Sequence, residues 1–344
     1  MSDIDIRVVG TVGRITLTRA KALNAMTYEM CLAIEAAFDG WRADPAVSVI
    51  VIDAEGDRAF CAGGDIAELY ATGRKGDFAF GQQFWADEYR LNYKIFTYPK
   101  PVVSFLNGFT MGGGVGIGCH GSHRIVGETS QIAMPECGIG LVPDVGGSLM
   151  LALAPGSIGE YLGMTAARMD AADAIYAGFA DIYIPEELWP SLIDQLERTG
   201  DVTLLDHTPH QAPGGKLKAQ STLINTHFKN PKPTAIKESL SREETDFARA
   251  TLKAMSRNAP LSLACTAEML RRLRETPDMA TALDLEYRFT YRAMAHGDLL
   301  EGIRAAIIDK DRNPQWQFAD GGVPQDRIDA MLAPLGSNAL KLEG

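Results

Sequence analysis

Residues 102–116 of this chain read VVSFLNGFTMGGGVG. The first five residues form a largely apolar run that ends at the turn pair Asn107-Gly108, a pattern typical of a strand buried on both faces. A second such run covers Val47–Ile52. The glycine-rich segment Met111–Gly116 follows the later strand and leads into an expected helix. Strand, helix and strand in this order predict an α/β fold built from stacked β/α units.

The N-terminal segment predicts a hairpin followed by a helix. Apolar residues alternate with polar ones over residues 4–8 and again over residues 15–17, and Gly10 and Gly13 mark the turn between them. Thr27 is expected to cap a helix whose apolar stripe has helical spacing, namely Met30, Ile34, Phe38 and Trp41.

The second half of the chain changes character. Residues 208–234 contain several prolines and glycines, including Pro209 and Pro213, and are expected to be rich in loops. Charged segments with helical periodicity follow at Glu243–Ser256, Leu261–Arg274 and Met279–Ala295. We therefore expect a catalytic core over residues 1–205 and a mainly α-helical region over residues 206–344, which completes the pocket and is a candidate for oligomer contacts.

The composition is that of a globular protein, with 46% apolar and 22% charged residues among 344. The formal net charge of −11 gives no general attraction to phosphate backbones, which argues against a nucleic-acid partner. The five cysteines are scattered without a C-x-x-C pair, which indicates a reducing compartment rather than a disulfide framework. The sequence shows no secretory pattern and no apolar stretch near the roughly 20 residues that a membrane span needs. These observations predict a cytoplasmic protein with no membrane partner.

Two glycine-rich segments are candidates for binding a negatively charged oxygen. The first is Phe60-Cys61-Ala62-Gly63-Gly64-Asp65-Ile66, and the second is Met111–Gly116. Glycine lets the backbone approach a ligand closely, and the first N–H groups of a helix lack partners within the helix. Two such N–H groups that converge from different loops form an oxyanion hole. Each segment taken alone is also compatible with a role in tight turns or in close packing of a helix.

A third segment, residues 134–147 (MPECGIGLVPDVGG), carries the carboxylates Glu136 and Asp144. A loop stiffened by proline can direct both at one reacting centre, one as base or nucleophile and the other as acid. The alternative is that Glu136 caps one helix and Asp144 caps the next, which begins near Gly146.

Other catalytic motifs lack support. No G-x-S-x-G is present, so a serine-elbow thioesterase is disfavoured. His120 and His123 have no nearby pattern that completes a metal site, so we expect no metal. Cys61 and Cys137 flank the glycine and carboxylate segments, and we interpret them as small apolar filler rather than reactive thiols.

Together, the order and spacing of these segments resemble those of the enoyl-CoA hydratase/isomerase superfamily, which has the crotonase fold. The segment Leu17–Ala25 (LTRAKALNA) is similar to its N-terminal motif. The resemblance implies a spiral of ββα units followed by helices, and it implies that Gly64 and Gly113 supply the oxyanion-hole N–H groups. It also implies that the coenzyme A adenine lies along two stretches of backbone, formed by Lys21, Ala22 and Leu23 and by Ala62, Gly63, Gly64, Asp65 and Ile66.

The resemblance narrows to one branch of the superfamily. Hydratases carry a glutamate where this chain has Gly116, and Asp144 is acidic where typical hydratases have no acidic residue. The pattern Met-Pro-Glu followed by Pro-Asp-Val-Gly-Gly resembles the 3-hydroxyisobutyryl-CoA hydrolase family. Further stretches agree with that family, among them residues 87–92 (DEYRLN), residues 286–288 (EYR), and residues 301–305 (EGIRA) with residues 309–314 (DKDRNP).

The implied activity is hydrolysis of an acyl-CoA thioester, with 3-hydroxyisobutyryl-CoA in valine breakdown as the expected substrate. Glu136 would act as nucleophile or as base, Asp144 would move a proton or bind the substrate hydroxyl, and Glu88 would position the acyl group. No cofactor is expected, because coenzyme A is part of the substrate. The alternatives are an enoyl-CoA hydratase or isomerase and a non-catalytic acyl-CoA binding protein. A homo-oligomer is compatible with the resemblance, which does not fix the number of subunits.

Overall fold

The computed structural model describes residues 3–206, 210–318 and 322–342, and its contacts divide the chain into two compact units. The first, which we call the sheet unit, comprises Met1–Asp65, Arg90–Ala133 and Arg168–Lys218. The second, the helical unit, comprises Ile66–Tyr89, Met134–Ala167 and Ala219–Gly344. The division expected from the sequence, into a core over residues 1–205 and a helical region over residues 206–344, separates the chain where its C-terminal helices begin. It describes a different property from these contact-based units, and it stays a prediction.

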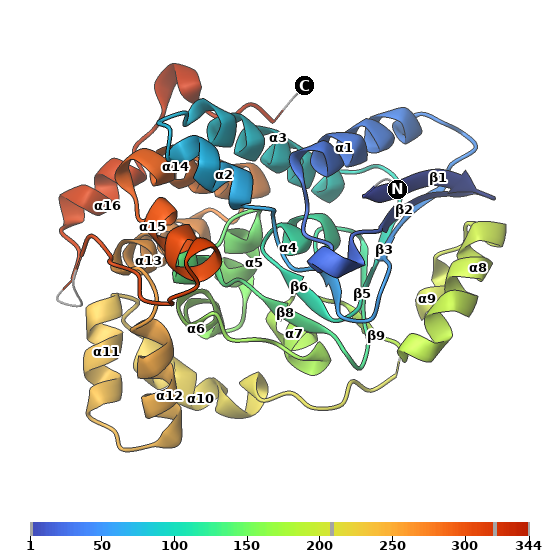
Figure 1. Cartoon of the computed structure of the whole chain (residues 1–344). Helices are drawn as coiled ribbons and strands as arrows, with labels where there is room; N and C mark the ends of the chain where they lie inside the picture. The colour runs from blue at the N-terminus through green and yellow to red at the C-terminus, as the bar shows by residue number, and fades with distance from the viewer. Residues whose placement is uncertain (1–2, 207–209, 319–321, 343–344) are drawn as a thin grey trace. The chain divides into compact units, whose positions relative to one another are not determined.

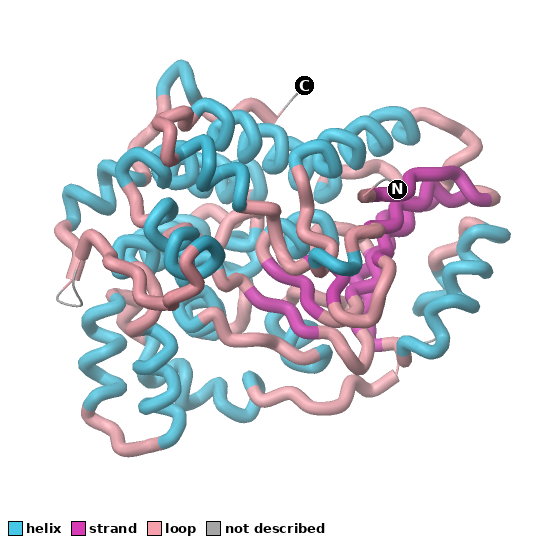
Figure 2. The backbone as a smooth tube through the Cα atoms, in the orientation of Figure 1, coloured by secondary structure: helices cyan, strands magenta, loops and turns pink. Residues whose placement is uncertain are grey.

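The sheet unit contains a six-stranded sheet (Figure 2). Its strands lie in the order β1 (Ile4–Val9), β2 (Val12–Leu17), β3 (Val49–Ala54), β5 (Val102–Leu106), β7 (His123–Val126) and β9 (Ile182–Tyr183). β1 and β2 form the expected antiparallel hairpin, and the other neighbouring pairs are parallel. The two apolar runs of the sequence supply β3 and β5, which are inner strands of this sheet.

A smaller parallel sheet lies in the same unit, and its strands precede the two glycine-rich segments and the carboxylate segment in the chain. It pairs β4 (Ala59–Cys61) with β6 (Phe109–Met111), and β6 with β8 (Gln131–Ala133). The carboxyl ends of parallel strands meet at one edge of a sheet. In the chain, β4 is followed by the Gly64 segment, β6 by the Gly113 segment, and β8 by Met134-Pro135-Glu136.

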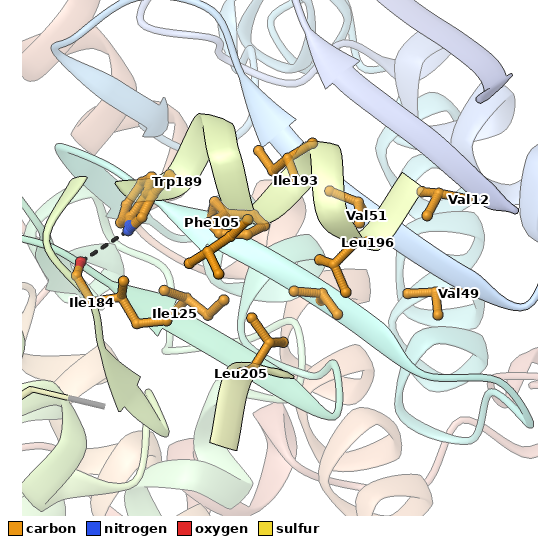
Figure 3. Close-up of a cluster of buried hydrophobic side chains, with 12 residues drawn as sticks. Val12, Val49, Val51, Phe105, Ile125, Ile184, Trp189, Ile193, Leu196 and Leu205 are labelled. Carbon is orange, nitrogen blue, oxygen red and sulfur yellow. Dashed lines mark hydrogen bonds between the residues drawn. The ribbon is translucent and has the colours of Figure 1, made fainter. Parts of the chain in front are cut away.

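One face of the six-stranded sheet is covered by α8 (Trp189–Thr199) and α9 (Thr203–Asp206). Figure 3 shows Trp189 and Ile193 of α8 directed at strand residues that include Phe105 and Val51. The rings of Trp189 and Phe105 lie 5.3 Å apart, and the indole N–H of Trp189 donates to the carbonyl of Ile184 (2.9 Å). The buried indole therefore satisfies its one polar group while its ring completes the core.

The helix expected after the hairpin is α1 (Tyr28–Arg42), and its cap is confirmed, because the Thr27 hydroxyl accepts from the Met30 N–H (3.2 Å). The apolar stripe of α1 is buried, as its spacing predicts. A Cβ on Gly13 of β2 would lie 2.5 Å from the Trp41 ring. Glycine at this position therefore lets α1 pack directly on the hairpin. The unit also contains η1 (Ala20–Ala22), α4 (Gly113–Gly118), α7 (Ala171–Ala177) and η3 (Glu186–Leu188).

The helical unit has no strand among its described residues (Figure 1). Its helices are α2 (Ala67–Gly73), the first part of α3 (Ala79–Phe96), η2 (Glu136–Ile139), α5 (Gly147–Leu153), α6 (Ile158–Thr165), nearly all of α10 (Leu217–Phe228), α11 (Pro233–Ser241), α12 (Asp246–Met255), α13 (Pro260–Glu275), α14 (Met279–His296), α15 (Leu299–Ile303), η4 (Arg304–Ile308), α16 (Gln325–Met331) and η5 (Gly336–Asn338). None of the described helices combines the length and apolar character needed to cross a membrane. An α/β fold with a helical C-terminal region is thus confirmed.

The expectation of a loop-rich stretch over residues 208–234 is wrong in part, because α10 lies within it. The prolines and glycines of this stretch flank the helix and do not interrupt it: Pro213 and Gly214-Gly215 precede Leu217, and Pro231 follows Phe228. Buried Ile224 and Phe228 anchor the helix by tertiary packing, which overrides the local signal of the flanking residues. Pro209 lies outside the described residues.

Candidate active site

The two glycine segments adopt backbone conformations that require glycine. Gly63 has a φ of 117°, and Gly112, the N-cap of α4, has a φ of 49° with a ψ of −120°. A bridge to Met26 uses the carbonyl of Gly63 (2.9 Å) and the N–H of Asp65 (2.8 Å), so the N–H of Gly64 takes no part in it. Gly113 is the first residue of α4, where the N–H has no acceptor within the helix.

The two segments approach each other closely within the sheet unit. A Cβ on Gly114 would lie 2.2 Å from the carbonyl oxygen of Cys61, and one on Gly63 would lie 3.5 Å from the carbonyl oxygen of Met111. Real Cβ atoms do not tolerate the first distance, so Gly114 allows α4 to pack against the backbone at the end of β4. Close packing and ligand-directed N–H groups, which the sequence left as alternatives, are therefore compatible roles of neighbouring glycines.

Replacing Gly114 by Ala should lower the free energy of unfolding by about 1–3 kcal/mol, because the added methyl group forces the backbone of α4 away from Cys61. Gly40→Ala is the matched control, since Gly40 lies in α1 with no atom within 4 Å of a Cβ. That variant should be neutral or more stable by up to about 1 kcal/mol. Urea denaturation of both variants measures the difference, and equal stabilities would contradict this role of Gly114.

The segments expected along the adenine are neighbours within the sheet unit. Lys21 and Ala22 are exposed, and the Ala62 N–H donates to the carbonyl of Leu23 (3.0 Å). Leu23 has a positive φ of 53°, and the side chain of the next residue, Asn24, fixes this turn by donating to the carbonyl of Ala59 (2.8 Å).

The remaining adenine-side residues divide between the units. The carboxylate of Asp65 accepts from Arg19 (3.1 Å) within the sheet unit. Ile66, which the sequence grouped with Asp65, is the first residue of the helical unit and the N-cap of α2.

The helical unit brings together buried carboxyl groups that are far apart in the sequence. We call Glu88 of α3, Glu136 of η2, Asp144 and Glu286 of α14 the carboxyl cluster; each is at most 5% exposed. The phenol of Tyr89, which is fully buried, donates to Oδ2 of Asp144 (2.7 Å). Among the described residues, Oε2 of Glu136 has no hydrogen-bond partner although it is buried. An unpaired buried carboxyl oxygen is costly, and such groups are characteristic of functional sites.

Burial makes every member of this cluster a weaker acid than an exposed carboxyl group. It raises the pKa of Asp144 to about 7 and that of Glu286 to about 8. Burial also raises the pKa values of Glu88 and Glu136 well above their ordinary range, and the negative charges of Asp144 and Glu286 raise both further. The Tyr89 hydroxyl opposes the shift in the pKa of Asp144, because it stabilises the ionised carboxylate. Near neutral pH the cluster therefore retains protons and loses them in coupled steps.

The alternative that Glu136 and Asp144 are helix caps is wrong. Pro135 is the N-cap of η2 and Gly146 is the N-cap of α5, and neither cap position is filled by a carboxylate. Glu286 accepts from the N–H groups at the start of α5 instead. The cysteines behave as expected: both Cys61 and Cys137 are buried, and burial raises the pKa of Cys137 to about 12.

Tyr89 and Glu286 are polar side chains of this site for which the sequence pattern predicts no role. A signal for Glu286 exists, because it occupies the buried stripe of α14 between Leu283 and Phe289, where a charged residue is unexpected. No group of three or more His, Cys, Asp or Glu residues within the described ranges is placed to hold a metal ion.

Comparison with known proteins identifies relatives over nearly the whole chain. A family model described as enoyl-CoA hydratase/isomerase matches residues 12–332. The chain is 38% identical to the mitochondrial 3-hydroxyisobutyryl-CoA hydrolase of Xenopus tropicalis, over 97% of this chain and 89% of the relative. It is 36% identical to a probable 3-hydroxyisobutyryl-CoA hydrolase 3 of Arabidopsis thaliana, over 92% and 87%.

Solved structures agree in fold. One described as an enoyl-CoA hydratase from Rhodobacter sphaeroides 2.4.1 has a TM-score of 0.96 and 55% identity, covering 99% of this chain and 100% of its own. Another, described as a carnitinyl-CoA dehydratase from Mycobacterium thermoresistibile, has a TM-score of 0.95 and 34% identity, with full coverage of both chains. The chain therefore belongs to the enoyl-CoA hydratase/isomerase family and has its crotonase fold.

Proposed function

We propose that this protein hydrolyses acyl-coenzyme A thioesters, with 3-hydroxyisobutyryl-CoA as its substrate and valine breakdown as its pathway. The observation that carries the proposal is that Glu136 and Asp144 are both buried and interact electrostatically, while the Tyr89 hydroxyl holds the Asp144 carboxylate in place. Full-length relatives that bear the name 3-hydroxyisobutyryl-CoA hydrolase support it.

In the proposed mechanism, the N–H groups of Gly64 and Gly113 bind the thioester oxygen. Negative charge develops on this oxygen when the carbonyl carbon is attacked, and preorganised donors stabilise that charge in the transition state. Losing one such donor typically costs on the order of 100- to 1000-fold in rate. The adenine lies along Lys21–Leu23 and along residues 62–66.

Glu136 acts on the carbonyl carbon by one of two routes. As a nucleophile it forms an anhydride with the acyl group while the carbon–sulfur bond breaks, and water then hydrolyses the anhydride. As a general base it removes a proton from a water molecule, whose oxygen attacks the carbonyl directly. Both routes require the ionised carboxylate, and its unpaired Oε2 is the oxygen available for either.

Asp144 exchanges a proton with the leaving thiolate or binds the 3-hydroxyl of the substrate, and Glu88 positions the acyl group. Because the pKa of Asp144 rises to about 7, its carboxyl group can both donate and accept a proton near neutral pH. The reaction needs no metal or redox cofactor, since coenzyme A is part of the substrate. A location in the cytoplasm and a homo-oligomeric state stay predictions; relatives such as the Xenopus protein are named mitochondrial.

Hydration of an enoyl-CoA is the second candidate, because the Rhodobacter structure at 55% identity is described as an enoyl-CoA hydratase. That reaction normally uses two opposed glutamates, and Gly116 in α4 replaces one of them. The test is incubation of the wild type with 3-hydroxyisobutyryl-CoA and with crotonyl-CoA, following free thiol and enoyl absorbance separately. Thiol release from the first substrate supports hydrolysis, enoyl loss without thiol supports hydration, and neither change indicates a binding protein.

Gly116→Glu should not convert the protein into an efficient hydratase. The new carboxylate supplies a charge without its positioning, and a displacement of about 1 Å can cost ~100-fold. Its charge, one helical turn from Gly113, also opposes the charge that develops on the thioester oxygen, so hydrolysis should fall. Crotonyl-CoA hydration by this variant at rates comparable with wild-type hydrolysis would show that Gly116 alone separates the two reactions.

A further inference from the structure

We propose that Glu286 is a positioning residue for the reaction: from α14 it fixes the turn that carries Asp144, and it thereby sets the placement of the Asp144 carboxylate. This inference rests on the proposed hydrolase function. It concerns a residue on a helix more than 100 positions further along the chain, and it involves only contacts within the helical unit.

The carboxylate of Glu286 accepts three hydrogen bonds from the segment immediately after Asp144. Its Oε2 accepts from the N–H of Gly146 (2.8 Å), and its Oε1 accepts from the N–H of Ser148 (3.1 Å) and from the Ser148 hydroxyl. Both N–H groups stand at the start of α5, where no acceptor within the helix is available. Glu286 is fully buried, so its carboxylate forms its hydrogen bonds with the turn and not with solvent.

The turn has a backbone conformation that needs such support. Val145 has a φ of 54° and Gly146 a φ of 80°. Glycine adopts a positive φ freely, but a β-branched residue such as valine does so rarely and under strain. Strained backbone persists where the surroundings over-determine it, and it clusters at functional sites. The hydrogen bonds that Glu286 accepts come from residues directly after Val145, so they are suited to hold Val145 in this conformation.

Asp144 is thereby fixed from two directions. The Tyr89 hydroxyl, on α3, orients its carboxylate, while Glu286, on α14, holds the backbone that follows it. The backbone carbonyl of Asp144 also accepts from the Gly147 N–H (2.7 Å). This arrangement leaves Asp144 little freedom, which is what proton transfer to a defined atom of a substrate requires.

Glu286 also acts on the cluster through its charge. The groups whose pKa it raises are Glu88 on α3, Glu136 on η2 and Tyr89, while the charge of Asp144 in turn raises the pKa of Glu286. Its negative charge raises the pKa values of Glu88 and Glu136. Removing this charge should lower both pKa values, so the loss of the last catalytic proton should occur at lower pH.

The decisive variant is Glu286→Gln, which keeps the size but places an N–H₂ group against one of the N–H donors of the turn. We expect kcat for 3-hydroxyisobutyryl-CoA to fall about 100-fold, the scale of a displacement of about 1 Å, with KM within a few-fold. The high-pH limb of the kcat profile should move to lower pH. Ser148→Ala, which removes one of the three bonds, should give a smaller loss of kcat in the same direction.

Two further variants separate positioning from mere stability. Glu160→Gln is the matched control, because Glu160 is a buried glutamate of the helical unit that pairs with Arg274 (2.7 Å), and its loss should lower Tm without changing the pH profile. Tyr89→Phe removes the donor that stabilises ionised Asp144, so its low-pH limb should move to higher pH. Carbon-13 titration of labelled aspartate, with Asp144→Asn for assignment, measures how Asp144 titrates in each variant without the need for turnover.

The outcomes are distinct. A lower kcat with a shifted pH profile in Glu286→Gln, and neither change in Glu160→Gln, supports the inference. An active wild type together with a Glu286→Gln variant of unchanged kcat and pH profile overturns it. So does a folded Glu286→Gln variant whose Asp144 resonance titrates as in the wild type. A wild type that releases no thiol refutes the proposed function instead, and the carbon-13 titration still decides whether Glu286 controls Asp144.

Discussion

Replacing Glu136 by Gln should abolish thioester hydrolysis while coenzyme A binding stays within a few-fold. Glutamine has nearly the same shape, but it can neither attack the carbonyl carbon nor accept a proton from water. We expect turnover to fall by about 10,000-fold, the upper end of what acid–base catalysis contributes. Thiol release measures turnover, and calorimetric titration with coenzyme A measures binding.

Glu160→Gln again provides the control, because it removes a buried carboxylate of the same unit outside the cluster. It should retain turnover and lose only stability. A Glu136→Gln variant that keeps half of the wild-type turnover would remove Glu136 from both proposed routes. In an acid-quenched single turnover of the wild type, an acyl group attached to Glu136 would identify the nucleophilic route.

Asp144→Asn should lower turnover by about 100- to 10,000-fold if Asp144 transfers a proton, since asparagine keeps the size but cannot exchange one. If Asp144 only binds the substrate hydroxyl, the loss should disappear with isobutyryl-CoA, which lacks that hydroxyl. The measurement is turnover of the wild type and the variant on both substrates across pH. Asp298→Asn, at another buried aspartate of the helical unit, serves as the control.

The pH dependence of the wild type adds a second readout for Asp144. The active form of the Glu136–Asp144 pair holds one proton, so the rate should fall at low pH when the pair gains a proton and at high pH when it loses the last. Because burial raises the pKa of Asp144 to about 7, the low-pH limb should lie near neutrality and not near pH 4. In Asp144→Asn this bell shape should collapse to a single limb. An unchanged profile and rate on both substrates would leave Asp144 without a catalytic role.

Local signals in the sequence were sufficient for much of the fold. The apolar runs at Val47–Ile52 and Val102–Leu106 become inner strands, because only a strand covered on both faces favours such continuous burial. Thr27 and the stripe after it predict α1 correctly, since capping and periodicity act within one helix. Helix α10 was missed, because the prolines and glycines beside it dominate the local pattern and its stability comes from packing.

The candidate site also has features that the sequence predicts and features that depend on tertiary packing. Glycine segments and paired carboxylates could be recognised from residue type, spacing and family resemblance. The contacts that shape the carboxylates could not, because Tyr89 and Glu286 meet the Asp144 loop only through tertiary packing. Residue type and spacing predict that one member of the Glu136–Asp144 pair acts as base or nucleophile and the other as acid, whereas burial raises the pKa values of both. Spacing indicates proximity along the chain, but it does not indicate how completely water is excluded.

The proposal that buried carboxylates hydrolyse the thioester is tested most directly by product analysis of the wild type with 3-hydroxyisobutyryl-CoA. Free thiol is followed against time, and 3-hydroxyisobutyrate is quantified by mass spectrometry in the same samples. We predict equal amounts of coenzyme A and 3-hydroxyisobutyrate, formed at a rate that Glu136→Gln reduces to background. Loss of substrate without free thiol, or thiol release that persists in Glu136→Gln, would contradict it.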